Sequence, residues 1–189
     1  MRNVVRFATR ALMFACLASL GAASTSAGAE IKGVAQLCPG QKICAWFQAN
    51  VALPKGWTQD VEASAQNHVT LLEPDKDDLG DEDALIYIQT SPENGPETLD
   101  EIIQSNLGTW RKSDPKATFV SEDSVRARGF KLYLFRNPDR PKQAYERIAY
   151  GFTKGSDGKR YFLTIVDTGA SREIIDKADI AFRYVLNQF

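Results

Sequence analysis

The sequence predicts an α+β fold in which one antiparallel β-sheet is flanked by two main α-helices, as a layered α/β/α sandwich. Two segments, one central and one C-terminal, carry apolar residues at helical spacing. Four β-like segments lie between them and are joined by short links. Strands joined by short links pair antiparallel, because a parallel pair needs a long crossover connection.

Three short β-like segments precede the central helix. Cys44 to Phe47 begins the first, and residues 30–43 before it are expected to form a short leader. Residues 69–72 form the second. The third, residues 84–88, is a continuous apolar run rich in β-formers, which predicts a strand covered on both faces. The acidic stretch 73–83 is too charged for burial and predicts an exposed loop.

Both helices have recognisable starting signals. Thr98 and Glu101 have the spacing of a capping box, and apolar side chains follow at helical spacing as far as Trp110. Ser171 is placed to cap the last helix, after the break that Gly169 supplies. The predicted apolar face of that helix consists of Ile174, Ala178, Phe182, Val185, Leu186 and Phe189.

The four strands between the helices are expected at residues 118–125, 130–135, 145–152 and 160–167. The link at residues 154–158 contains the glycines that a hairpin turn needs. It therefore joins the last two strands as neighbours in the sheet.

The first 29 residues have the three parts of a secretory signal peptide. Three arginines precede an uncharged apolar run from Ala11 to Ala23, and small residues end at Ala29. The run is too short to span a bilayer, which needs about 20 apolar residues. An uncleaved anchor is the alternative, but no stop-transfer pattern follows. We expect cleavage after residue 29, loss of Cys16 with the signal, and a periplasmic or secreted protein.

Removing the signal leaves 160 residues, the size of one domain, which we place at residues 44–189. The mature chain keeps 20 basic and 24 acidic residues, a net charge of about −4. Nucleic-acid binders carry a basic stripe, so this balance argues against a nucleic-acid partner. No later segment is apolar for long enough to insert into a membrane.

Cys38 and Cys44 flank a Pro39-Gly40 pair that favours a turn. In an oxidising compartment, a close pair of this kind most often forms a disulfide, and we expect one here. Free thiols or a redox-active pair are the alternatives, although the spacing is not that of thioredoxin-like motifs.

The sequence contains no recognisable catalytic constellation, and we expect neither catalysis nor a cofactor. His68 is the single histidine, which leaves few ways to build a triad or a zinc site. A hydrolase that uses the scattered carboxylates Glu122, Asp123 and Glu146 is an alternative. Carboxylates on strands, however, are usually cross-strand charge partners.

The acidic stretch partly matches a calcium-binding loop. The weak candidate ligands are Asp75, Asp77, Asp81 and Asp83. Leu79 and Ile86 occupy positions where such a loop needs oxygen ligands, so a solvated loop is the favoured interpretation.

Element order and four segments resemble the PsbP-like fold family, which includes Mog-like and DcrB-like proteins. The segments are LPKGW at 53–57, TLDEIIQSNLGTW at 98–110, QAYERIAYGF at 143–152 and KRYFLTIVDT at 159–168. The resemblance covers roughly residues 45–189. It implies an antiparallel sheet flanked by helices and an accessory, protein-binding role without catalysis, and it carries over no catalytic motif.

The leading functional hypothesis is an exported, non-catalytic accessory protein that binds another envelope protein. One alternative is an immunity or inhibitor protein for a periplasmic toxin, because an acidic surface suits a basic toxin site. Another is a small-molecule or calcium-binding envelope module. Trp46, Trp57 and Trp110 are candidates for a binding surface, although their positions on apolar faces favour core packing.

Overall fold

The computed structural model describes residues 28–38, 42–76, 80, 83–122 and 129–189. Apart from residues 28 and 29, the predicted signal peptide lies outside the described residues, as does Cys16. The calcium candidates Asp77 and Asp81 lie outside them as well.

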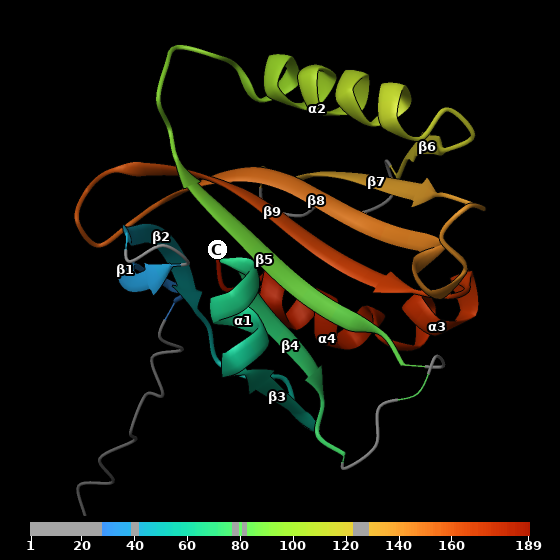
Figure 1. Ribbon diagram of the computed structural model, residues 1–189, viewed down its shortest axis with the longest axis horizontal. Helices are drawn as coiled ribbons and strands as arrows, with labels where there is room; N and C mark the ends of the chain where they lie inside the picture. The colour runs from blue at the N-terminus through green and yellow to red at the C-terminus, as the bar shows by residue number, and fades with distance from the viewer. Residues whose placement is uncertain (1–27, 39–41, 77–79, 81–82, 123–128) are drawn as a thin grey trace, which may run out of the picture.

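The described residues form one antiparallel sheet of nine strands (Figure 1). The strands are β1 (Glu30–Cys38), β2 (Lys42–Asn50), β3 (Trp57–Asp60), β4 (Thr70–Pro74), β5 (Leu85–Pro92), β6 (Thr118–Ser121), β7 (Lys131–Arg136), β8 (Tyr145–Lys154) and β9 (Arg160–Gly169). The main order is β1-β2-β5-β9-β8-β7-β6, and β3 joins the sheet through β4, which also pairs with β5.

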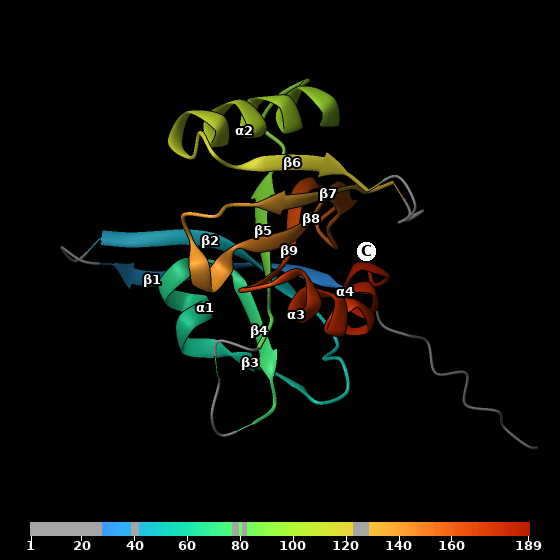
Figure 2. The same ribbon diagram turned by 90° about the vertical axis from the view of Figure 1, so that its right-hand side faces the viewer.

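Helices cover both sides of this sheet. They are α1 (Val61–Asn67), α2 (Leu99–Ser113), α3 (Arg172–Lys177) and α4 (Asp179–Leu186), with a 3-10 turn η1 at Pro141–Gln143. Figure 2 shows α2 on one side of β7, β8 and β9, and α3 with α4 on the other. The predicted α+β class, with an antiparallel sheet between helices, is therefore confirmed.

Each face of the sheet has its own apolar cluster. On the α2 side, Ile103 and Leu107 of α2 pack against Ile148, Tyr150 and other residues of the strands. On the opposite side, Phe182 and its neighbours on α4 belong to a cluster with residues of β5, β8 and β9. Side chains alternate between the two faces along each strand, so residues next to each other in the sequence belong to different clusters.

The start of α2 follows the predicted capping box. The Glu101 backbone N–H donates to Thr98 Oγ1 at 3.3 Å, and the Thr98 backbone N–H donates to Glu101 Oε2 at 2.7 Å. Two of the N–H groups that a helix start leaves without partners are satisfied in this way.

Residues 30–38 form β1 rather than a leader. Each residue from Glu30 to Cys38 has a register partner in β2. Gly33 and the charged side chains Glu30 and Lys32 weaken the β-strand pattern of this segment in the sequence.

Two further differences concern helices. The last helix is divided at Ala178 into α3 and α4, and Ile175 rather than Ile174 is buried. The short α1 was not predicted, and Asp60 caps it by accepting from the Ala63 backbone N–H at 2.8 Å. A seven-residue helix is too short to leave a clear apolar period in the sequence.

Two glycines should respond to alanine in opposite directions. A Cβ on Gly151 would lie 2.5 Å from the Phe130 ring, so Gly151→Ala should lower the free energy of unfolding by about 1–3 kcal/mol. Gly108 lies inside α2 with open space around its Cβ position, so Gly108→Ala should raise it by up to about 1 kcal/mol. Denaturant titration measures both, and a Gly151→Ala protein as stable as wild type would contradict this packing.

Candidate functional site

The β1–β2 hairpin projects from the sheet (Figure 2). All nine residues of β1 pair with β2, but β2 has a single register pair with β5, Phe47 opposite Thr90. The part of the hairpin beyond that pair, residues 33–38 and 42–46, is here called the arm. Its position leaves one edge of β1 without a neighbouring strand among the described residues.

β1 contributes no charged residue to the arm, and several small or apolar residues of the arm are exposed. Residues 33–38 contain no charged side chain, and Ala35 and Ala45 are exposed. Ile43 is 76 % exposed, a high value for a large apolar side chain. A long edge strand without charges is a template for pairing with another chain, and proteins usually protect such an edge with lysine, proline or a covering element.

The base of the arm is fixed to the rest of the domain. Trp46 is 7 % exposed, and its ring lies 5.9 Å from that of His68, which ends α1 in the left-handed conformation. Thr70 Oγ1 donates to the Ala49 carbonyl at 2.8 Å. His68 is therefore part of the packing that holds the hairpin against α1.

The register of the hairpin brings the two mature cysteines near each other. Cys38 lies opposite Lys42 and Cys44 opposite Gln36, so the cysteines are diagonal neighbours across the two strands. The Cys38 side chain lies outside the described part of the structure, and the disulfide remains a prediction.

If the arm is cross-linked, protein purified without reductant should lack free thiols and should gain two hydrogens on reduction. Intact-mass measurement after alkylation, with and without reductant, detects this. Cys44→Ser should then lower the free energy of unfolding by about 2 kcal/mol, because the unfolded chain loses a closed loop. Two alkylated cysteines in the unreduced protein would rule the cross-link out.

A buried arginine organises the face under α3 and α4. Arg147 on β8 is 3 % exposed, and its guanidinium lies 2.7 Å from Asp176, 2.9 Å from Asp179 and 3.3 Å from Glu122. Arg147 Nη1 also lies 3.6 Å from Asp167 Oδ2. Removing one partner from such a cluster would leave an uncompensated buried charge, so we assign it a structural role.

Asp167 is the member of this cluster with the most unusual environment. It is fully buried, and neither carboxyl oxygen has a hydrogen-bond partner among the described residues. Burial raises its pKa to about 8, although Arg147 acts in the opposite direction. Arg172 and Arg183 also contact the cluster. Three guanidinium groups therefore lie among four carboxyl groups.

Glu146 occupies the opposite face of β8. It is 4 % exposed, and burial raises its pKa to about 7, with Arg140 lowering it and Asp114 raising it. Its Oε2 atom has no hydrogen-bond partner in the described part of the chain. Glu146 is thus buried beside Thr168, its register partner on β9.

These two carboxyls should make the protein less stable as pH rises. Their ordinary pKa values are about 4, so between pH 4 and pH 7–8 the native state binds more protons than the unfolded state. The free energy of unfolding should fall by up to about 1.4 kcal/mol per pH unit for each group.

Urea titration from pH 4 to pH 9 measures this slope. Glu146→Gln and Asp167→Asn should each reduce it, whereas the exposed Glu97→Gln is the matched control. A wild-type stability that rises over this range would contradict the assignment.

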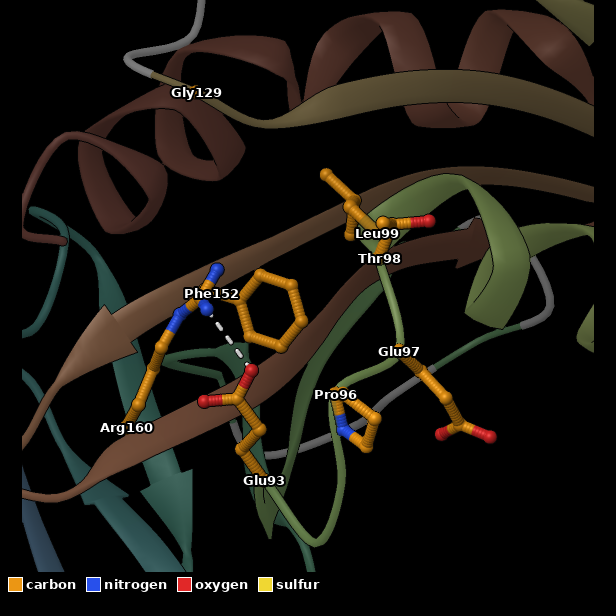
Figure 3. A pocket seen from close by; sticks show the side chains of 8 residues that line it. All are labelled: Glu93, Pro96, Glu97, Thr98, Leu99, Gly129, Phe152 and Arg160. Carbon is orange, nitrogen blue, oxygen red and sulfur yellow. Dashed lines mark hydrogen bonds and ion pairs between the residues drawn. The ribbon is translucent and has the colours of Figure 1, made fainter.

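A cleft of about 530 Å³ lies at the start of α2 (Figure 3). The Arg160 guanidinium lies 3.8 Å from the centroid of the Phe152 ring and 2.9 Å from Glu93 Oε1. Figure 3 shows the Arg160 side chain beside the ring and directed at Glu93. The Arg160 guanidinium and the Phe152 ring face therefore already contact each other within the protein. A ligand in this cleft would be left mainly with solvent-exposed polar groups.

The carboxylates of the hydrolase alternative are not brought together. Glu122 contacts Arg147 and Arg172, whereas Glu146 is on the other face of the sheet. Asp123 lies outside the described residues. The sequence did not point to Arg147 or Asp167, because a single charged pair within two apolar strands resembles a cross-strand surface pair.

The other candidates are separated in the structure. Asp83 is 2.5 Å from Lys76 Nζ, and Asp75 is exposed. No three histidine, cysteine or acidic side chains of the described residues are grouped as metal ligands. The tryptophans are separated too. Trp110 packs with Phe119 and Phe135, and Trp57 packs against the α4-side cluster.

No helix within the described part of the chain is long and apolar enough to cross a bilayer. Comparison with models of known protein families and with curated proteins found no match.

Proposed function

We propose that this is an exported, non-catalytic accessory protein that binds an extended segment of another polypeptide along the free edge of β1. The observation that carries the proposal is the nine-residue edge strand, the outer part of which is uncharged and projects beyond the sheet. Addition of a strand to an exposed edge is a common mode of peptide recognition.

The partner's chemistry follows from the arm. Backbone N–H and C=O groups on the free edge would pair with any extended chain, so side chains must supply selectivity. Gly33, Ala35 and Ala45 are small, and Ile43 is large, apolar and exposed. An extended segment with alternating apolar side chains fits this surface better than a highly charged one.

Two adjacent proline variants separate binding from folding. Backbone N–H groups of an edge strand point alternately toward the neighbouring strand and outward. Of Val34→Pro and Ala35→Pro, one should remove a β1–β2 hydrogen bond and lower the melting temperature. The other should remove an outward N–H and leave the melting temperature nearly unchanged, because edge strands tolerate proline.

The variant that keeps its melting temperature should weaken partner binding by about tenfold or more. Photo-crosslinkers at positions 34 and 35, with position 109 on α2 as the matched control, identify the partner in envelope extracts. The expected result is a crosslinked second protein from the arm positions alone, lost in the folded proline variant. Equal crosslinking from position 109, or crosslinks only between two copies of this chain, would reject the proposal.

A further inference from the structure

A glycine occupies the edge strand where the arm begins. Gly33 lies opposite Phe47 in the β1–β2 register. Residues directly opposite each other share one face of a sheet. The pair before them on that face, Ile31 with Ala49, belongs to the α4-side cluster, whereas Ala35, the next residue on the same face of β1, is exposed. Gly33 and Phe47 therefore lie where the covered part of this face ends and the arm begins.

The Phe47 ring reaches toward the space above Gly33. A Cβ atom on Gly33 would lie 3.9 Å from Phe47 Cε1, an ordinary contact distance. No other Phe47 atom lies within 4 Å of that position, so the ring presents an edge rather than its face. Its centroid is 5.2 Å from that of the buried Tyr161 ring, and the α4-side cluster holds it in place. The empty space above Gly33, with the Phe47 ring as its wall, is here called the notch.

The notch lies beside the free edge of β1. Among the described residues, β2 is the only strand that pairs with β1. A strand added to the free edge would place one side chain directly opposite Gly33, on the same face as the Phe47 ring. Neighbouring strands are about 4.8 Å apart, so that side chain would start about 10 Å from the Phe47 backbone with no side chain between them. A long side chain on the added strand can therefore contact the ring across the glycine.

We infer that the notch is a specificity site, which selects an aromatic side chain at the position of the partner strand opposite Gly33. The edge of the Phe47 ring carries the positive part of the aromatic quadrupole, and it favours the face of a second ring over an aliphatic group. A small side chain at that position would leave the notch empty. This inference rests on the proposed addition of a strand to β1, and it adds the residue type that the partner supplies at one position.

The probes are peptides of nine residues, the length of β1, with lysine at both ends and alternating threonine and valine between them. In three versions, phenylalanine, leucine or alanine replaces the central valine. Amide chemical shifts of the ¹⁵N-labelled protein are followed during titration of each peptide. The phenylalanine peptide should give saturable shifts at residues 32–35. The leucine peptide should bind about twofold to tenfold more weakly, and the alanine peptide at least about tenfold more weakly.

Gly33→Val should fill the notch and weaken binding of the phenylalanine peptide by about tenfold or more. Gly33 has no positive φ, and β-branched residues favour strands, so this variant should melt no earlier than wild type. Ala35→Val is the matched control, because it adds bulk to the same exposed face of β1 but lies opposite Ala45 instead of Phe47. It should keep the preference for phenylalanine over leucine and for leucine over alanine.

Phe47→Leu keeps an apolar wall but removes the ring, so it should lose the preference for phenylalanine over leucine. Thermal melting of all three variants checks that each is folded. The inference is overturned if wild type binds the three peptides equally, if none of them shifts residues 32–35, or if Gly33→Val discriminates among them as Ala35→Val does. Equal binding at residues 32–35 would overturn the notch alone and leave strand addition intact, and the crosslinking test at positions 34 and 35 decides the proposed function separately.

Discussion

One edge of β5 is shared between two strands, and this sharing determines where the arm lies. β4 pairs with residues 86–88 of β5, and β2 receives only the pair between Phe47 and Thr90. A hairpin with one register pair to the sheet cannot lie along it, so the β1–β2 hairpin projects as the arm. The same arrangement places Leu71 of β4 beside Tyr87 of β5.

One end of the β8–β9 pair is polar on both of its faces, although the centre of the pair is apolar. Glu146 and Thr168 occupy one face, and Arg147 and Asp167 occupy the other. On the α3 side, three arginines contact the acidic groups around Asp167. Asp167, Glu146 and Thr168 each keep a buried oxygen without a hydrogen-bond partner in the described structure.

The sequence predicted the elements that have strong local signals. The capping box at Thr98, the alternating strands from Lys131 to Gly169 and the cap at Ser171 are all decided by residues within a few positions of each other. The sequence predicted a strand covered on both faces at residues 84–88. Only one face of β5 is fully buried, because Leu85 and Tyr87 on the other face line a hollow of about 370 Å³ beside α1, β4 and η1. The Arg147 cluster likewise depends on contacts between distant segments, for which a single sequence carries no period or motif.

The arm is only loosely tied to the stability of the domain. No described residue of the arm belongs to either apolar cluster, and Ala35, Ile43 and Ala45 are exposed. Local opening of such a segment requires much less free energy than global unfolding. A partner that orders the arm would therefore act on an easily opened part of the domain, and its binding would leave the central strands unchanged.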